Sequence, residues 1–586
     1  MKTVQFFWHY FKVYKFSFVV VILMIVLATF AQALFPVFSG QAVTQLANLV
    51  QAYQNGNPEL VWQSLSGIMV NLGLLVLVLF ISSVIYMCLM TRVIAESTNE
   101  MRKGLFGKLA QLTVSFFDRR QDGDILSHFT SDLDNILQAF NESLIQVMSN
   151  IVLYIGLILV MFSRNVTLAL ITIASTPLAF LMLIFIVKMA RKYTNLQQKE
   201  VGKLNAYMDE SISGQKAVIV QGIQEDMMAG FLEQNERVRK ATFKGRMFSG
   251  ILFPVMNGMS LINTAIVIFA GSAVLLNDKS IETSTALGLI VMFAQFSQQY
   301  YQPIIQVAAS WGSLQLAFTG AERIQEMFDA EEEIRPEKAP TFTKLQESVE
   351  ISHIDFSYLP DKPILKDVSI SAPKGQMTAV VGPTGSGKTT IMNLINRFYD
   401  VGGIYFDGKD IRGYDLDSLR SKVGIVLQDS VLFSGTIRDN IRFGVPDANQ
   451  EMVEVAAKAT HIHDYIESLP DKYDTLIDDD QSIFSTGQKQ LISIARTLMT
   501  DPEVLILDEA TSNVDTVTES KIQHAMEVVV AGRTSFVIAH RLKTILNADQ
   551  IIVLKDGEVI ERGNHHELLK LGGFYSELYH NQFVFE

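Results

Sequence analysis

Six apolar stretches occupy the first half of the sequence. Each is about 20 residues long, the length that a helix needs to cross the hydrocarbon core of a bilayer. Helices are the expected form, because backbone polar groups in lipid must find their hydrogen-bond partners within the protein. The stretches span residues 16–38, 68–90, 144–162, 166–187, 251–276 and 284–307. The sequence therefore predicts a membrane bundle of six helices.

Lysine and arginine are unevenly distributed among the connections between these stretches. Lys2, Lys12 and Lys15 precede the first stretch, neither residue type occurs in 40–66, and the connections after the second and fourth stretches are rich in both. Basic connections stay on the cytoplasmic side of a membrane. The pattern predicts a multi-pass protein of the cytoplasmic membrane with both termini in the cytoplasm.

The two basic connections are too long for structureless loops. Their apolar residues recur at helical spacing, as in Leu105, Leu109 and Leu112. Breaks at 120–124 and 213–216 could let a helical hairpin turn. We expect the spans to continue into the cytoplasm, with the hairpin tips as candidate contacts for a second domain; solvated helix connections are the alternative.

A charged segment with two prolines, 322–345, follows the sixth stretch. Beyond it, short strands rich in valine and isoleucine alternate with helical segments, the pattern of an α/β domain. The expected organisation is a helical membrane domain at 1–321, a linker at 322–345 and an α/β domain at 346–586. The net charge of −13 argues against a nucleic-acid partner, which needs a basic surface.

A complete P-loop lies between the strand at 379–381 and the helix that follows it. Glycine is required where the backbone wraps around phosphates with its N–H groups inward. Lys388 can reach the β- and γ-phosphates, and the Thr389 hydroxyl can bind Mg²⁺. The expected nucleotide-binding residues here are Gly382, Pro383, Thr384, Gly385, Ser386, Gly387, Lys388, Thr389 and Thr390. The motif predicts that ATP and Mg²⁺ are the cofactors.

Two adjacent carboxylates, Asp508 and Glu509, follow the apolar strand at 504–507. Asp508 is suited to hold Mg²⁺, and Glu509 to orient and activate the water that attacks the γ-phosphate. The pair predicts ATP hydrolysis as well as ATP binding.

Together these motifs resemble the ATP-binding cassette family in its exporter arrangement, and the resemblance covers the whole chain. It implies a half-transporter that works as a dimer and couples ATP hydrolysis to transport. It also implies that Tyr358 stacks on adenine, that Gln428 senses Mg²⁺ and the membrane domain, and that His540 contacts the γ-phosphate. The segment that ends at Asp515 is similar to the loop that reaches the other subunit.

The family's signature loop, usually Leu-Ser-Gly-Gly-Gln, reads Phe484-Ser485-Thr486-Gly487-Gln488 here. Ser485, Gly487 and Gln488 match the positions that face the nucleotide of the opposite subunit. Thr486 replaces a glycine, and a β-branched residue resists positive φ and close approach to a phosphate. The acidic run Asp478–Asp480 before the loop is a second departure.

These departures indicate a dimer whose two ATP sites are unequal. The chain resembles the catalytically intact subunit of bacterial heterodimeric multidrug exporters, with a non-identical partner, one consensus ATP site and one degenerate site. An active homodimer is the alternative.

The sixth stretch carries the residues predicted to line a substrate cavity. They combine aromatic rings with uncharged hydrogen-bonding groups and suit flat amphipathic compounds. They are Phe293, Gln295, Phe296, Gln298, Gln299, Tyr300 and Gln302. Hydrogen bonding between helices is an equally weighted interpretation.

The resemblance favours drugs and dyes as substrates, with lipids or a lipopeptide second. A nucleotide-gated channel or membrane regulator is a further alternative, which Glu509 and His540 oppose.

Overall fold

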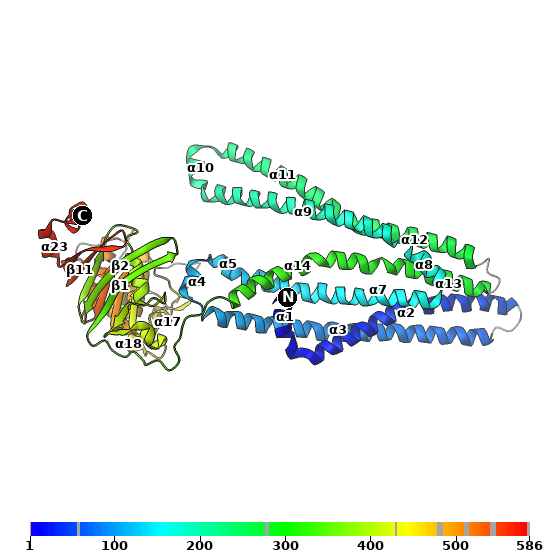
Figure 1. The fold of residues 1–586 in the computed structure, drawn as a ribbon, viewed down its shortest axis with the longest axis horizontal. Helices are drawn as coiled ribbons and strands as arrows, with labels where there is room; N and C mark the ends of the chain where they lie inside the picture. The colour runs from blue at the N-terminus through cyan, green and yellow to red at the C-terminus, as the bar shows by residue number, and fades with distance from the viewer. Residues whose placement is uncertain are drawn as a thin grey trace. The chain divides into compact units, whose positions relative to one another are not determined.

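The computed structural model describes residues 2–54, 59–275, 281–427, 430–477, 484–508, 515–538 and 546–582. The chain forms two units, each with its own internal contacts (Figure 1). Unit 1 comprises Met1–Ala110 and Arg120–Ala330, and unit 2 comprises Gln111–Arg119 and Glu331–Glu586. The short segment Gln111–Arg119, which lies inside the first half of the sequence, therefore belongs to the second unit.

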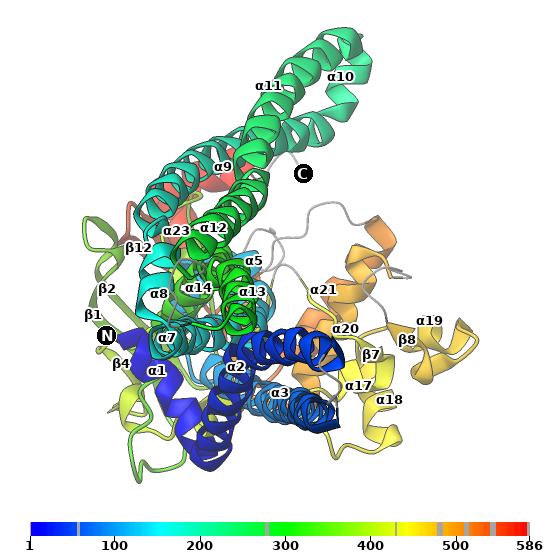
Figure 2. The same ribbon diagram turned by 90° about the vertical axis from the view of Figure 1, so that its right-hand side faces the viewer.

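Unit 1 consists of helices joined by short turns among its described residues. Figure 2 shows α9 and α11 as a long hairpin closed by α10. The helices are α1 (Lys2–Phe11), α2 (Lys15–Gln54), α3 (Glu59–Leu109), α5 (Asp122–Ser127), α6 (Leu133–Gln138), α7 (Ile145–Arg164), α8 (Val166–Ile173), α9 (Thr176–Ser213), α10 (Gln215–Gln221), α11 (Gln224–Gly250), α12 (Leu252–Leu275), α13 (Thr283–Tyr300) and α14 (Gln302–Phe328), with a 3₁₀ turn η1 (Lys12–Tyr14) and π-helical turns η2 (His128–Asp132) and η3 (Ala139–Leu144).

Five helical stretches in the described part of the chain are long and apolar enough to cross a membrane. They are Gln5–Tyr53, Val61–Leu109, Asp122–Arg164, Val166–Ser213 and Gln224–Leu275. The first four contain the first four predicted spans, and the fifth contains the predicted span 251–276 except for residue 276, which lies outside the described residues. Each is longer than its predicted span, because the helices continue beyond the apolar residues. Helical continuation of the spans was expected from the spacing of apolar residues in the two basic connections.

The sixth predicted span, 284–307, is divided in the structure. Tyr301 separates α13 from α14, and Pro303 occupies the first turn of α14. Proline has no backbone N–H and is favoured in the first turn of a helix, which fits the position of the break. A count of six spans remains a prediction.

The boundary between the predicted domains differs from the expectation of 1–321 for the membrane domain. Helix α14 continues to Phe328, and unit 2 begins at Glu331. Arg323 holds this last part of α14 in unit 1 by donating hydrogen bonds to Asp132 (3.1 Å) and Ser127 (3.0 Å) and to Asp124. Asp132 is buried and also contacts His128 at 2.9 Å.

Unit 2 contains an α/β domain built on two larger sheets. Its strands are β1 (Ser348–Leu359), β2 (Lys362–Pro373), β3 (Met377–Val381), β4 (Ile404–Phe406), β5 (Lys409–Asp410), β6 (Val423–Val426), β7 (Gly435–Thr436), β8 (Leu476–Ile477), β9 (Val504–Asp508), β10 (Thr534–Ile538), β11 (Gln550–Lys555) and β12 (Glu558–Gly563). Its helices are α4 (Val114–Asp118), α15 (Lys388–Ile395), α16 (Leu416–Ser421), α17 (Ile437–Ile441), α18 (Gln450–Ala459), α19 (His463–Ser468), α20 (Thr486–Met499), α21 (Thr516–Val530), α23 (His565–Leu571) and α24 (Phe574–Gln582), with 3₁₀ turns η4 (Ile411–Gly413) and η5 (Lys472–Asp474).

The larger sheet has the strand order β12-β11-β3-β10-β9-β6, and only the edge strand β12 runs antiparallel to its neighbour. A second, antiparallel sheet has the order β2-β1-β4-β5. Apolar side chains of α15 pack on one face of the parallel strands, and those of α20 and α21 pack on the other. Strands covered on both faces read as continuous apolar runs, which is why the sequence made them recognisable.

Candidate nucleotide-binding site

Four parallel strands of the larger sheet end at one edge. Val380 of β3 and Asp508 of β9 are both in register with Ile538 of β10, and Val426 of β6 is in register with Leu507. Carboxyl ends of parallel strands meet at the same edge, where ligands bind in open α/β sheets. The P-loop, which follows β3, and Asp508 therefore leave the sheet side by side, separated only by β10.

Three predicted catalytic residues fall outside the described part of the chain. Gln428 follows the end of β6 by two residues, His540 follows the end of β10 by two, and Glu509 is the residue after β9. Their roles remain predictions.

Two glycines of the P-loop, Gly382 and Gly387, are closely packed against neighbouring strands. Gly387 caps α15 with a φ of +102°, a left-handed conformation that favours glycine. A Cβ on Gly387 would lie 2.6 Å from Leu365, and one on Gly382 would lie 2.2 Å from the carbonyl oxygen of Leu554. The loop thus turns around an interior that side chains at these positions would obstruct.

Polar groups on this loop suit a phosphate. The hydroxyl of Ser386 is buried and has no hydrogen-bond partner among the described residues. Thr384, Gly385 and Thr389 are exposed on the loop, and Pro383 is half-buried. Backbone N–H groups at the start of α15 add a favourable site for an anion. This donor set fits the ATP and Mg²⁺ that the motif predicts.

Lys388 is buried beneath the loop. Its ammonium group donates hydrogen bonds to the carbonyl oxygens of Gly382 (2.8 Å) and Pro383 (3.0 Å). Burial lowers the pKa of Lys388 below its ordinary value, and the negative charge of Asp508 partly opposes this effect. A phosphate close to the ammonium group would act in the same direction as Asp508 and favour the charged form.

Tyr358, at the end of β1, lies against the P-loop helix. Its hydroxyl donates a hydrogen bond to Thr390 Oγ1 (3.2 Å) and accepts one from Asn393 Nδ2 (3.3 Å). Its half-buried ring packs edge-on against Phe356 and Tyr399. Thr390 is buried and contacts this tyrosine. The predicted stacking of Tyr358 on adenine remains a prediction.

The signature loop caps α20. Ser485 Oγ accepts a hydrogen bond from the Gln488 N–H (3.3 Å), and Gln488 Oε1 accepts one from the Ser485 N–H (2.9 Å). Thr486 is the first residue of α20 and does not have a positive φ. The expected backbone strain at Thr486 is therefore wrong, and at this position the difference from glycine is the exposed side chain. Gly487 is buried.

Asp515 caps α21. Its carboxylate accepts a hydrogen bond from the Thr518 N–H at 2.9 Å, and this contact lowers the pKa of the carboxyl group. The predicted role of Asp515 toward the nucleotide of another subunit remains a prediction, and capping is a sufficient local reason for an aspartate here.

The predicted substrate residues of the sixth stretch fall into two groups. Phe293, Phe296 and Tyr300 are buried in the core of unit 1, with the Tyr300 hydroxyl 2.6 Å from that of Tyr154. In this conformation the aromatic residues pack between helices, because α13 lies against α2 and α12. Gln298 is exposed, Gln299 and Gln302 are half-buried, and Gln295 donates a hydrogen bond to Ser39 (2.7 Å).

The sequence did not reveal how closely the first hairpin tip is tied to unit 2. The break expected at 120–124 is matched in part, because residues 119–121 separate α4 from α5, which already begins at Asp122. A second break, at 110–113, precedes α4. Tyr399 donates a hydrogen bond to Asp118 (2.5 Å), and Arg119 donates one to the carbonyl oxygen of Tyr358 (3.2 Å). Since these partners are distant in the sequence, only the folded chain reveals them.

The second tip matches its predicted position. Helix α9 ends at Ser213, within the expected break, and α10 follows at once.

A P-loop at the edge of a parallel sheet, fused to a unit of apolar helices, defines an ATP-driven membrane transporter. Residues 18–300 match the ABC transporter transmembrane region, and residues 365–512 match the ABC transporter ATP-binding domain. The chain is 38% identical over 587 residues to the uncharacterized ABC transporter ATP-binding protein YfiC of Bacillus subtilis, covering 99% of this chain and 94% of that protein. The chain belongs to the ABC transporter family.

Two further relatives have names that state a function. The fatty acid ABC transporter ATP-binding/permease protein of Mycobacterium tuberculosis is 37% identical, with 84% of this chain and 77% of that protein covered. The ATP-dependent lipid A-core flippase of Desulfotalea psychrophila is 36% identical, with 85% and 86% covered. A solved bacterial Atm1-family ABC exporter with ATP bound superimposes with a TM-score of 0.75 at 26% identity, covering 97% of this chain and 98% of that one.

These likenesses confirm several predictions. The chain is a multi-pass membrane exporter of half-transporter architecture, with a helical transmembrane domain fused to an ABC ATPase domain that hydrolyses ATP to drive transport.

Proposed function

We propose that this chain exports amphipathic compounds with a lipid-like apolar chain out across the cytoplasmic membrane. The observation that carries the proposal is an apolar groove of about 400 Å³ in unit 1. The groove lies between α7, α9 and α14, and its walls include Ile151, Phe180 and Val307. Apolar ligands bind in such grooves by removing their surface from water.

Polar side chains lie beside one end of this groove. Gln146 is one helical turn before Asn150, which lines the groove, and it contacts Gln306 and accepts a hydrogen bond from Ser310 (3.1 Å). An apolar wall next to uncharged hydrogen-bonding groups suits a molecule with one long apolar part and one polar end. The names of the relatives, a fatty acid transporter and a lipid A-core flippase, support the same class.

Amphipathic drugs and dyes are the second candidate class. The exposed Gln298 and half-buried Gln299 and Gln302 support it, because they could hydrogen-bond to a flat polar compound.

Transport into inside-out vesicles would separate the two classes. We expect ATP-dependent uptake of a fluorescent long-chain fatty acid, and at least about a tenfold loss in Ala308→Trp, since indole would fill the groove and tenfold corresponds to about 1.4 kcal/mol. Leu159→Trp, on an exposed position of α7, is the matched control. Uptake of a fluorescent cationic dye but not of the fatty acid would show that drugs are the substrates.

The residues of the nucleotide site take the following roles in this proposal. The P-loop and Lys388 hold the phosphates, and Tyr358 stacks on adenine. Thr389, Gln428 and Asp508 hold Mg²⁺, which supplies charge neutralisation when bound. Glu509 orients the attacking water and His540 contacts the γ-phosphate. Distribution of Lys and Arg supports cytoplasmic termini, on the same side as cellular ATP.

We further propose a non-identical partner chain. The exposed Thr486 side chain at the first position of α20 stands where the family has glycine. The acidic run Asp478–Asp480, which lies outside the described residues, precedes it in the sequence and adds negative charge there. Both features disfavour a phosphate at the N-terminus of α20, so a dimer with an intact signature loop from another chain would have one efficient site.

Thr486→Gly tests the partner proposal directly. In protein purified without any partner, we expect Thr486→Gly to raise ATP turnover several-fold, because the methyl group no longer blocks close approach to a phosphate. Phosphate release measures this, and Thr283→Gly, at the exposed first position of α13 in unit 1, controls for a glycine at a helix start. Full turnover by the unaltered chain alone, with no gain in the variant, would establish an active homodimer.

A further inference from the structure

The chain passes between its two units at three points. These lie between Ala110 and Gln111, between Arg119 and Arg120, and between Ala330 and Glu331. Any movement of unit 2 that acts on unit 1 through the chain must pass through these connections. The structure shows how the segments beside them are held inside unit 2.

The segment that begins at Gln111, after the first connection, is hydrogen-bonded to the segment that begins at Glu331, after the third. The Glu333 N–H donates a hydrogen bond to the carbonyl oxygen of Gln111 at 2.8 Å. Leu112 and Glu332 form an isolated antiparallel bridge. Two parts of the chain more than 200 residues apart in sequence thus form a single short piece of sheet.

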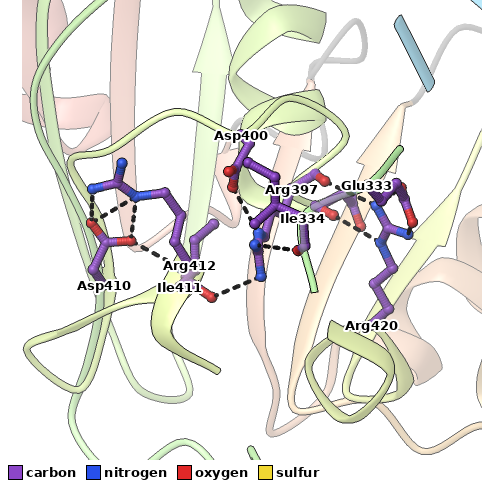
Figure 3. Close-up of polar contacts among 9 residues, drawn as sticks. Glu333, Ile334, Arg397, Asp400, Asp410, Ile411, Arg412 and Arg420 are labelled. Carbon is purple, nitrogen blue, oxygen red and sulfur yellow. Dashed lines mark hydrogen bonds and ion pairs between the residues drawn. The ribbon is translucent and has the colours of Figure 1, made fainter. Parts of the chain in front are cut away.

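Side chains then fix this piece of sheet to the α/β domain (Figure 3). Arg420 of α16 binds the Glu333 carboxylate with two hydrogen bonds, at 2.7 and 2.9 Å. The same guanidinium group donates to the carbonyl oxygen of Arg397 (2.9 Å). Arg397 is itself buried and donates to the carbonyl oxygen of Ile334 (2.9 Å) and to Asp400 (3.0 Å). Paired arginine and carboxylate groups of this geometry are strong and direction-specific.

Arg397 connects this network to the nucleotide site. It lies two residues after the end of α15, the helix whose first residue is Lys388 of the P-loop. Tyr399, two residues further on, donates a hydrogen bond from its hydroxyl group to Asp118 of α4. Burial and the contact with Asp118 raise the pKa of Tyr399, so the hydroxyl group stays protonated and can donate this bond. The segment around Asp118 and the segment around Glu333 are therefore both bonded to residues that follow the C-terminal end of α15.

Unit 1 contains a matching tie between the continuations of these segments. Arg323, near the end of α14, donates to Asp132 and Ser127, which lie just after the first tip. In each unit, therefore, the segment next to the first tip and the segment next to the linker are joined by hydrogen bonds. In unit 2 the bond is between Gln111 and Glu333, and in unit 1 Arg323 binds Asp132 and Ser127.

We propose that Gln111–Asp118 and Glu331–Arg335, here called the tip–linker clamp, move as one body and carry the displacement of α15 on ATP binding to unit 1. Glu333, Arg397 and Arg420 are positioning residues in this inference, because they act through the clamp and not on the nucleotide. The inference rests on the proposed ATP-driven transport but not on the identity of the substrate.

A disulfide across the bridge tests whether the clamp moves as one body. The chain has one cysteine, Cys88, so Leu112→Cys and Glu332→Cys are combined with Cys88→Ser. Directly opposed residues of an antiparallel bridge have Cα atoms about 4.5–5.5 Å apart, within the range of disulfides. We expect the oxidised protein to keep ATP turnover and transport within about twofold of the reduced protein. A block on oxidation, reversed by reduction, would show that the two segments separate during the cycle and would overturn the proposal.

Glu333→Gln tests whether the clamp transmits movement. We expect ATP turnover within about twofold of the unaltered protein and at least about a fivefold fall in molecules exported per ATP, because the paired hydrogen bonds with Arg420 are weakened. Glu337→Gln is the matched control, since it makes the same chemical change at an exposed residue two positions beyond the clamp. The charge-reversed pair Glu333→Arg with Arg420→Glu should restore part of the coupling.

The readouts separate this inference from the proposed substrate. The assay uses whichever probe, fatty acid or dye, the unaltered protein exports, and ATP turnover needs neither. Equal losses of turnover and export together with a lower unfolding temperature would show that Glu333 only stabilises the fold. Unchanged coupling in Glu333→Gln would show that the clamp transmits nothing.

Discussion

Glu509→Gln is expected to lower ATP turnover at least about 100-fold while leaving ATP affinity within about twofold. Positioned general bases contribute about 10²–10⁴-fold to a rate. Glutamine preserves the size of the side chain and its ability to hold a water, but it cannot take up a proton. Phosphate release measures turnover, and a fluorescent ATP analogue measures binding.

The position of Glu509 supports this expectation. It follows Asp508, which ends β9 at the same sheet edge as the P-loop. Glu451→Gln, at an exposed site on α18, provides a matched control with the same chemical change. Normal turnover in Glu509→Gln would exclude it as the base and favour the reading of the chain as a nucleotide-binding regulator.

Gly387→Ala is expected to weaken ATP binding more than about tenfold. A left-handed conformation costs a residue with a Cβ about 1–2 kcal/mol, and about 1.4 kcal/mol corresponds to tenfold in affinity. The added Cβ would also lie 2.6 Å from Leu365, which is buried in the core of unit 2 and has little room to move. Relief of both effects requires the loop to leave the shape that receives phosphates.

The control for this change is Gly413→Ala. There the added Cβ meets only the flexible side chain of Lys409, at 3.2 Å, and φ is not positive. We expect ATP affinity within about twofold for this control, measured with the same fluorescent analogue, and unfolding temperatures report whether either variant disturbs the fold. Unchanged ATP affinity in Gly387→Ala would mean that the loop adopts another shape when it binds the nucleotide.

Local patterns in the sequence determined the fold class and the place of the nucleotide site. Long apolar runs require helices in lipid, and apolar runs flanked by glycine predict buried parallel strands. The P-loop and the Asp508–Glu509 pair were recognisable because each chemical role depends on a few residues adjacent in sequence. The sequence did not show that the segment after β3 and the end of β9 would share one edge with a single strand between them, because strand order arises from packing.

Tertiary structure decided the remaining points. Thr486 looked strained by comparison with glycine, yet the cap formed by Ser485 and Gln488 gives it an ordinary helical backbone. Phe293, Phe296 and Tyr300 matched a substrate wall by residue type, but burial between helices depends on neighbours that no local pattern specifies. The bond between Gln111 and Glu333 is the clearest case, since hydrogen bonds between distant segments exist only once the chain has folded. Sequence thus determined what chemistry the chain carries, and tertiary contacts decided which distant segments are joined by hydrogen bonds.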